Sequence, residues 1–309
     1  MPGRWSLTDL SVRVGKTTFK NPVLVASGTF GYGEEYSELF DLNQLGGIVT
    51  KSITLNPREG NPPPRTCETP SGMLNSIGLA NVGVDRFIQE KIPFLNKFNT
   101  NIIINVAGST PEEYLRVVEK LNHAQGIDML EINISCPNVK EGGMAFGSDP
   151  ESAHRCTSSI RKVTNYPLMV KLTPNVKDIV EIAQAVEDSG ADCISLINTL
   201  VGMAIDFRIK KPLLKTVTGG LSGPAIKPVA LAMVWKVSQK VKIPVVGIGG
   251  ITNTQDALEF LLAGASLIQV GTSNFVDPQT SVRIIEGLKD YCEKNEIKRV
   301  MEIVGKLEN

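Results

Sequence analysis

Eight short apolar segments recur along the chain, and they limit what it can fold into more than any other feature. Several are rich in Val and Ile and nearly continuous in apolar character, as strands buried on both faces are. Because helical patterns separate many of them, we expect a parallel sheet that closes into a (β/α)8 barrel. The expected strands are Pro22–Ser27, Gly47–Lys51, Ile102–Val106, Met129–Ser135, Leu168–Leu172, Cys193–Ile197, Val245–Ile248 and Leu267–Val270.

Amphipathic segments supply the expected helices, which are Pro111–Ala124, Val176–Ser189, Pro224–Val241, Thr254–Ala263 and Pro278–Lys294. Thr110, with Glu113 three residues later, is typical of a capped helix start. Before the first strand, Leu10–Val14 and Thr17–Phe19 predict a hairpin that closes the bottom of the barrel. We expect a single domain over residues 1–309.

Three of the loops that follow expected strands are long, covering residues 52–81, 137–149 and 199–223. Long ordered loops in compact domains are usually functional. All three would emerge at the C-terminal face of the barrel, where barrel enzymes keep their active sites.

Composition narrows the partners and the compartment. Lys plus Arg and Asp plus Glu are both 32, so the net charge is zero. This balance argues against nucleic acid or an anionic membrane as the main partner, although a local basic patch stays open. No apolar run approaches the roughly 20 residues that a membrane span needs. Five scattered cysteines without a CxxC pair, and two histidines, indicate a reducing cytoplasm, no disulfide framework and no metal site.

The fourth strand ends in a chemically rich run, Glu131 to Asn138, which contains a thiol, a proline and two carboxamides. A free cysteine is usually a small buried hydrophobe, and Cys193 fits that interpretation because it begins a buried strand. Cys136 differs because it joins a strand tip to a Gly-rich loop. A thiol with a reference pKa of about 8.5 suits proton removal near neutral pH, so Cys136 is the candidate acid–base group.

Three glycine-bearing turns are candidates for binding phosphate: 219–223, 247–251 and 270–273. Glycine lets backbone N–H groups approach an anion closely, and loops after strands seven and eight form the usual phosphate site of such barrels. Tight turns alone are the alternative for any one of them. All three together favour phosphate binding, but they do not distinguish a phosphorylated substrate from a nucleotide cofactor.

Two lysines, Lys51 and Lys171, lie at or within apolar strands. Burying an ammonium group is costly unless its charge has a partner. Snorkelling to solvent and a structural ion pair are the alternatives. We favour two cations that face a shared anionic ligand near the barrel mouth, because the glycine turns already predict an anion there.

These motifs together resemble the dihydroorotate dehydrogenase family, and class 1B catalytic subunits in particular, over roughly Leu7 to Leu288. The resemblance is carried by Ala26–Thr29, Thr50–Thr54, Asn75–Asn81, Asn133–Asn138, Val170–Pro174, Ile197–Thr199, Gly219–Gly223, Gly249–Gly250 and Gly271–Thr272.

The resemblance implies an FMN-containing barrel that oxidises dihydroorotate to orotate in de novo pyrimidine biosynthesis. It implies that Cys136 removes the C5 proton, that hydride passes from C6 to flavin N5, and that Lys171 stabilises negative charge on the flavin. The implied catalytic residues are Cys136 and Lys51. The implied substrate-binding residues are Lys51, Asn75, Ile77, Gly78, Leu79, Asn133, Asn138, Asn198 and Thr199. The implied FMN-binding residues are Ser27, Lys51, Ser52, Asn105, Asn133, Lys171, Ile197, Gly223, Gly249, Gly250, Gly271 and Thr272.

The subtype follows from Cys136 and the loop after it. Class 2 enzymes have serine at the Cys136 position and an N-terminal membrane-associating extension. Class 1A enzymes also use cysteine but pass electrons to fumarate. The loop 139–147 is more similar to class 1B, whose members pair with a subunit carrying FAD and a [2Fe–2S] cluster and reduce NAD⁺. The resemblance therefore implies a homodimer core within a heterotetramer.

Three alternatives stay open. The first is the fumarate-dependent class 1A enzyme. The second is a dihydropyrimidine dehydrogenase-like reductase, which shares the barrel and a related Cys motif. The third is a non-catalytic phosphate- or flavin-binding module, which would leave Cys136, Lys51 and the asparagines unexplained.

Overall fold

The computed structural model describes residues 8–135 and 146–308. Parallel strands form a closed barrel in the order β10-β15-β16-β3-β4-β7-β8-β9. The strands are β3 (Val23–Val25), β4 (Gly47–Val49), β7 (Asn101–Val106), β8 (Met129–Asn133), β9 (Leu168–Leu172), β10 (Cys193–Leu196), β15 (Val245–Ile248) and β16 (Ala265–Val270). Each overlaps one predicted segment, so the predicted (β/α)8 barrel is confirmed. All their residues except Asn101 are buried, which explains their continuous apolar character.

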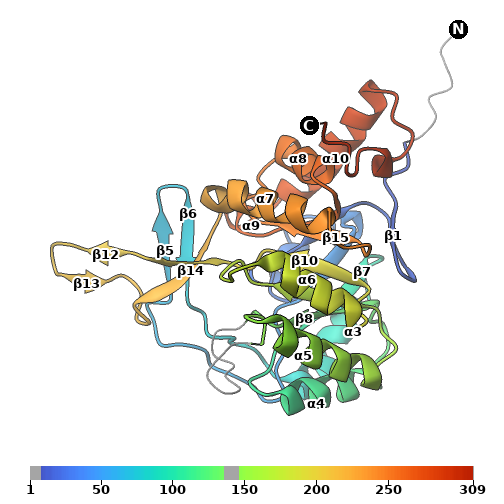
Figure 1. The fold of residues 1–309 in the computed structure, drawn as a ribbon. Helices are drawn as coiled ribbons and strands as arrows, with labels where there is room; N and C mark the ends of the chain where they lie inside the picture. Colours follow the sequence, from blue (N-terminus) through green and yellow to red (C-terminus); the bar gives the residue numbers. More distant parts are fainter. Residues whose placement is uncertain (1–7, 136–145, 309) are drawn as a thin grey trace, which may run out of the picture.

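Helices cover the outside of the barrel (Figure 1). The longer ones are α4 (Pro111–Leu121), α5 (Pro150–Val163), α6 (Ile179–Asp188), α7 (Lys227–Ser238), α8 (Thr254–Leu262) and α10 (Thr280–Lys294). The shorter ones are α1 (Glu34–Ser37), α2 (Val84–Arg86), α3 (Ile92–Leu95), α9 (Ser273–Val276), the π-helical η2 (Phe87–Lys91), and the 3₁₀ segments η1 (Leu42–Gln44), η3 (Pro224–Ile226) and η4 (Val300–Glu302).

The five helices expected from the sequence are confirmed, and α5 is an addition. Its buried stripe is narrow and includes a threonine, so its apolar periodicity is weak. At the start of α4, Thr110 caps the helix as expected, because its side chain accepts a hydrogen bond from the Glu113 N–H. The Glu113 carboxylate accepts instead from the Ser109 N–H at 2.5 Å, so the reciprocal capping bond is displaced by one residue.

The predicted N-terminal hairpin is present as β1 (Val12–Val14) and β2 (Thr17–Phe19). The Thr17 hydroxyl donates to the carbonyl of Asp128, which immediately precedes β8, at 3.2 Å. The Phe19 side chain is fully buried. The hairpin therefore lies at the N-terminal end of the barrel, opposite the face where the long loops emerge.

Two of the long loops contain strands that the sequence did not predict. β5 (Thr66–Thr69) and β6 (Gly72–Asn75) join β11 (Leu200–Met203) and β14 (Thr218–Ser222) in an antiparallel sheet of order β11-β14-β6-β5. A smaller pair, β12 (Ile205–Asp206) and β13 (Lys211–Pro212), extends from it as a projecting arm (Figure 1). These strands are short and β14 is rich in glycine, so their pairing is not visible in local patterns.

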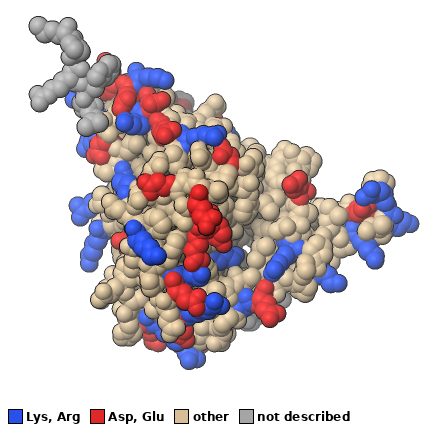
Figure 2. Space-filling view, turned by 180° about the vertical axis from the view of Figure 1, so that it is seen from behind, with Lys and Arg blue, Asp and Glu red and all other residues tan. Residues whose placement is uncertain are grey.

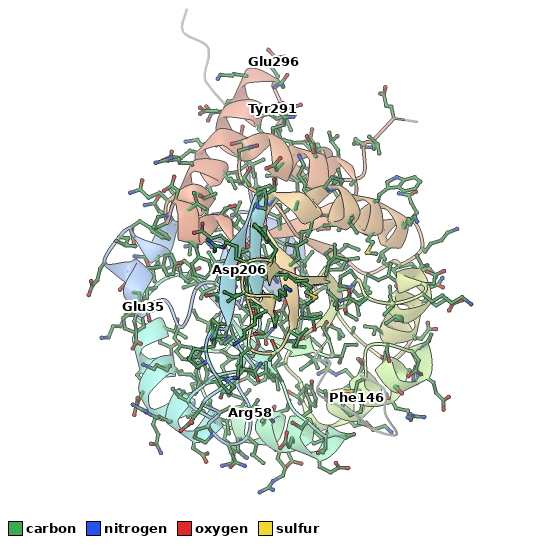
Figure 3. The ribbon with its side chains drawn as sticks, turned by 90° about the vertical axis from the view of Figure 1, so that its left-hand side faces the viewer. Glu35, Arg58, Phe146, Asp206, Tyr291 and Glu296 are labelled. Atoms are coloured by element: carbon green, nitrogen blue, oxygen red, sulfur yellow. The ribbon has the colours of Figure 1, made fainter. Side chains whose placement is uncertain are left out.

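The surface of the arm differs from the rest of the molecule. Figure 2 shows acidic and basic side chains intermixed over the barrel, with basic side chains gathered at the far end of the arm. Viewed from the arm's side of the molecule, Asp206 lies in projection over the centre of the barrel (Figure 3). Arg208 and Lys210 are exposed there, and Phe207, just before Arg208, is 81% exposed. Among the helices of residues 8–135 and 146–308, none is long and apolar enough to cross a membrane.

Candidate active site

The predicted site residues that the structure describes lie at the C-terminal ends of the barrel strands or in the sheet beyond them. Asn105 and Lys171 point from β7 and β9, and Asn133 ends β8. Ser27, Lys51, Ser52, Ile197, Asn198, Thr199, Gly249, Gly250, Gly271 and Thr272 follow the strands within a few residues. Cys136 and Asn138 lie outside the described residues.

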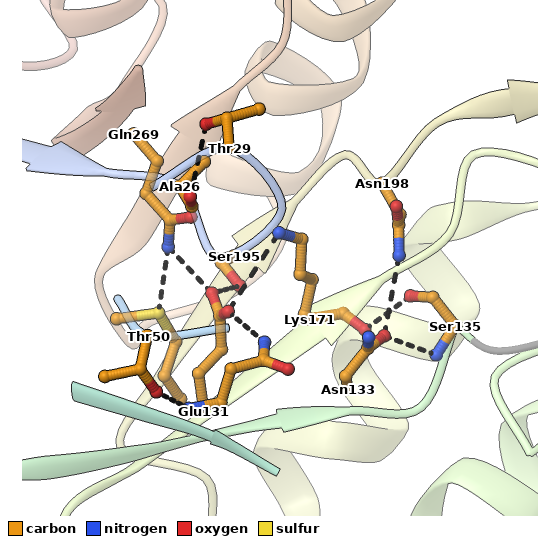
Figure 4. Close-up of polar contacts among 12 residues, drawn as sticks. Ala26, Thr29, Thr50, Glu131, Asn133, Ser135, Lys171, Ser195, Asn198 and Gln269 are labelled. Carbon is orange, nitrogen blue, oxygen red and sulfur yellow. Dashed lines mark hydrogen bonds and ion pairs between the residues drawn. The ribbon is translucent and has the colours of Figure 1, made fainter. Parts of the chain in front are cut away.

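Asn133 is the centre of one hydrogen-bonded group (Figure 4). Its side-chain oxygen accepts from the Ser135 N–H at 3.2 Å and from the Asn198 amide at 3.5 Å. Its backbone carbonyl accepts from the Tyr114 hydroxyl at 2.7 Å, which ties the strand end to helix α4. The Ser135 hydroxyl donates to the Lys171 carbonyl at 2.8 Å. The strand tip before Cys136 is therefore held on both sides.

A second group lies inside the barrel, around the fully buried Glu131. Its carboxylate accepts hydrogen bonds from the side chains of Asn105 at 2.5 Å, Ser195 at 2.8 Å and Gln269 at 2.7 Å. The Lys171 ammonium is 4.0 Å from the same carboxylate, and the Lys171 side chain is 7% exposed. The lysine therefore has a buried ionic partner.

Sequence reasoning assigned no role to Glu131, Ser195 or Gln269. The usable signal is the one that identified Lys171, namely a polar side chain inside an otherwise apolar strand. In the sequence, each of these residues is an isolated polar position. Closure of the barrel is what brings Ser195 and Gln269 to Glu131.

Lys51 lies close to these charges. Burial lowers the pKa of its ammonium group from the ordinary 10.5, and the positive charges of Arg65 and Lys171 lower the pKa further. Its backbone N–H donates to the Gly31 carbonyl at 2.8 Å, which fixes the chain just after β4. The mouth therefore holds cations where burial limits screening by water, which favours an anionic ligand.

The three predicted glycine turns come together at one side of the mouth. Gly223, Gly249 and Gly250 have φ angles of 97°, 133° and 72°, which side chains rarely adopt. A Cβ atom on Gly250 would lie 2.9 Å from the Gly223 carbonyl oxygen. The Thr272 hydroxyl donates to the Ser222 hydroxyl at 2.8 Å, joining the last turn to the first. We call residues 222–223, 249–250 and 271–272 the glycine cradle.

The antiparallel sheet brings the other predicted substrate residues to the mouth. Asn75 pairs with Gly220 across β6 and β14, and its amide donates to the Gly220 carbonyl at 3.4 Å. A Cβ atom on Gly220 would lie 2.0 Å from the Thr199 hydroxyl oxygen, so Thr199 packs against the same point. Ile77, Gly78 and Leu79 follow β6 and are half-buried.

In chemical terms the site combines cations, carboxamides and a glycine cradle. The carboxamides can recognise a planar polar molecule through paired donors and acceptors. Within the described ranges, no cluster of three or more His, Cys, Asp or Glu side chains is suited to hold a metal ion.

Sequence comparison gives the family. The family model for dihydroorotate dehydrogenase matches residues 9–292. The chain belongs to this family. It is 56% identical over 299 residues to the catalytic subunit of dihydroorotate dehydrogenase B (NAD(+)) of Geotalea uraniireducens, a match that covers 97% of this chain and 98% of that protein.

Two further relatives carry the same description. The protein of Bacteroides thetaiotaomicron is 54% identical over 302 residues, covering 98% of this chain and 100% of its own length. The protein of Desulforamulus reducens is 56% identical over 297 residues, covering 96% of this chain and 98% of its own. The family predicted from the sequence motifs is therefore confirmed, and the chain is an oxidoreductase.

Proposed function

We propose that this chain is the catalytic subunit of an NAD-dependent dihydroorotate dehydrogenase, which oxidises dihydroorotate to orotate in de novo pyrimidine biosynthesis. The observation that carries the proposal is the mouth itself, where the half-buried Lys51, the buried Lys171 and the hydrogen-bonded Asn133 and Asn198 lie at the strand ends beside the glycine cradle. Relatives that match over nearly the full length of both chains carry that description, which supports the proposal.

The residues present fit FMN, the cofactor that the family implies. The side-chain oxygen of Asn105 is buried and has no hydrogen-bond partner in the described part of the chain, and a flavin ring has an imide N–H that could donate to it. The glycine cradle suits the phosphate. The residues that would hold FMN are Ser27, Lys51, Ser52, Asn105, Asn133, Lys171, Ile197, Gly223, Gly249, Gly250, Gly271 and Thr272.

When bound, FMN supplies the two-electron chemistry by accepting hydride from C6 of the substrate. Lys51 would orient the substrate carboxylate as a charge-assisted hydrogen-bond donor. Asn75, Asn133 and Asn198, with Thr199 and the backbone of residues 77–79, would hold the pyrimidine ring. Cys136 and Asn138 are proposed for the same site, with the Cys136 thiolate accepting the C5 proton.

The partner is proposed as a separate electron-transfer subunit that carries FAD and a [2Fe–2S] cluster and reduces NAD⁺. The words "catalytic subunit" in the relatives' descriptions support a second chain, and "NAD(+)" supports the acceptor. A homodimer of this chain at the core of a heterotetramer is part of the same proposal.

The acceptor is tested by co-purifying the chain with the products of neighbouring genes and assaying dihydroorotate oxidation with NAD⁺ or fumarate. We expect turnover with NAD⁺ that depends on a co-purifying subunit. Turnover with fumarate by the chain alone would favour the class 1A alternative. Reduction of uracil without activity on orotate would favour the dihydropyrimidine dehydrogenase-like alternative.

The base is tested with Cys136→Ser. We expect the variant to retain bound FMN but to reduce it with dihydroorotate about 10²- to 10⁴-fold more slowly at neutral pH, because a serine hydroxyl is a far weaker acid than a thiol. Stopped-flow single-turnover reduction measures this. Cys67→Ser, in the half-buried strand β5, is the matched control and should react at the wild-type rate. Equal rates for Cys136→Ser and wild type would exclude the assignment.

A further inference from the structure

Glu131 carries a negative charge in the middle of barrel strand β8, where its side chain has no exposed surface. The Lys171 ammonium lies 4.0 Å from its Oε2 atom, on the neighbouring strand β9. Removing both charges from water is expensive, and removing only one partner leaves an uncompensated buried charge. The buried ion pair is therefore not explained by a gain in folding stability alone.

Neutral groups hold the carboxylate independently of Lys171. Oε1 accepts from both the Ser195 hydroxyl and the Gln269 amide, and Oε2 accepts from the Asn105 amide. These donors come from strands β10, β16 and β7, so they surround the carboxylate on several sides (Figure 4). The negative charge of Glu131 is thus fixed in place by neutral donors. At the longer distance of 4.0 Å it is the counter-charge of Lys171, whose ammonium group can still face the mouth.

A second cation lies near Lys171. Lys51 is close enough that the charge of Lys171 lowers the pKa of its ammonium group, and Arg65 acts on Lys51 in the same direction. Among the described residues, Glu131 is the one carboxylate within 4.0 Å of the Lys171 ammonium. Without it, Lys171 would be a buried cation beside a second cation, and both burial and a neighbouring like charge disfavour the charged form of an amine.

We propose that Glu131 is a positioning residue whose fixed negative charge keeps the Lys171 ammonium protonated at the floor of the flavin site. This inference rests on the proposed function, because its consequence is felt by bound FMN. In the wild type, two-electron reduction of bound FMN would take up one proton, at flavin N5, and would leave the ring anionic beside the already charged Lys171. In Glu131→Gln, Lys171 Nζ is neutral before reduction and takes up a second proton as negative charge develops beside it.

The test is the pH dependence of the midpoint potential of bound FMN. For a two-electron couple, each tenfold change in proton concentration shifts the potential by about 30 mV per proton taken up. We expect the wild-type slope of about 30 mV per pH unit to double in Glu131→Gln across the neutral range. Ser195→Ala removes one hydrogen bond from the same carboxylate without changing its charge, so it should keep the wild-type slope. An unchanged slope in FMN-loaded Glu131→Gln would overturn the proposal.

A double variant provides the second measurement. Glu131→Gln combined with Lys171→Met removes both charges, so it should unfold at a higher temperature than Glu131→Gln alone and should keep the one-proton slope. If the single variant does not hold FMN, the comparison of thermal unfolding decides. A double variant no more stable than Glu131→Gln would overturn the proposal. A wild-type chain that binds FMN but is not reduced by dihydroorotate would contradict the proposed function, while this comparison would still stand.

Discussion

The site is defined by single residues that carry charge at buried positions, where desolvation costs free energy. Lys171 could be predicted because it interrupts an apolar strand. Asn133 could be found in the polar run at the end of a strand, and Asn105 only through the family resemblance. The structure places all three at one mouth. Glu131 and Gln269 interrupt strands in the same way, but nothing local shows that a strand 138 positions away supplies the partner. Residue types are thus readable from sequence, whereas their pairing follows from barrel closure.

The lowered pKa of Lys51 predicts proton uptake when an anion binds. In the proposed function the orotate carboxylate binds beside Lys51 and favours its charged ammonium, so binding should take up protons as the pH rises into the range of the lowered pKa. Isothermal titration calorimetry in buffers of different ionisation enthalpy measures this uptake. We expect Lys51→Met to abolish it and to weaken binding by about 10- to 100-fold, as for a lost charge-assisted hydrogen bond.

The exposed Lys240 provides the control for that measurement, and Lys240→Met should behave as wild type.

The lowered pKa of Lys51 also fixes the sign of the pH dependence of stability in the absence of ligand. Between the lowered pKa and 10.5 the unfolded chain binds more protons at this residue, so its contribution to stability rises with pH. Unchanged proton uptake in Lys51→Met would assign the uptake to another group.

Whole elements differ in how clearly the sequence shows them. Barrel strands and the helices around them carry their own periodicity, so eight strands and five helices could be predicted. The antiparallel sheet at the mouth could not, because β6 and β14 pair across 145 residues and Gly219 and Gly220 weaken any strand signal. From the sequence alone, the strands of this sheet are predicted as loops, because they are defined by pairing with distant partners.

The Gly250 turn makes a prediction at this scale. Gly250→Ala must adopt a φ of 72° and place its Cβ 2.7 Å from the Lys227 Cβ, whereas Gly305→Ala has a φ of 70° with no atom within 4 Å. We expect the control Gly305→Ala to lose about 1–2 kcal/mol of unfolding free energy, the cost of left-handed backbone alone. Gly250→Ala should lose more and should also bind FMN more weakly. Urea unfolding and flavin fluorescence titration measure the two effects, and equal losses with equal affinity would argue against a shaped cradle.

The whole molecule depends on a core that continues from the barrel to the N-terminal hairpin. Phe19 is fully buried at the closed end, far from the mouth. Phe19→Ala should therefore destabilise the protein by about 3–5 kcal/mol, as a large-to-small core substitution does, while FMN affinity in the folded fraction is retained. Chemical denaturation monitored by circular dichroism measures the change.

Leu39 is the control for this prediction, because its side chain is 52% exposed. Leu39→Ala should change the unfolding free energy by about 0.5 kcal/mol or less. If Phe19→Ala were as mild as Leu39→Ala, the hairpin would be an appendage rather than part of the core.

The buried Glu131 has one more consequence, and it concerns which barrel can form. Because side chains alternate between the two faces of a strand, moving β8 by a single residue against its neighbours would turn the carboxylate outward into the helix layer. The amides of Asn105 and Gln269 would then lose their acceptor inside the barrel. A misaligned barrel would thus bury a carboxylate and two amides without hydrogen-bond partners, which costs desolvation free energy. The residue proposed to act on the ligand site therefore also favours one register of the strands around it.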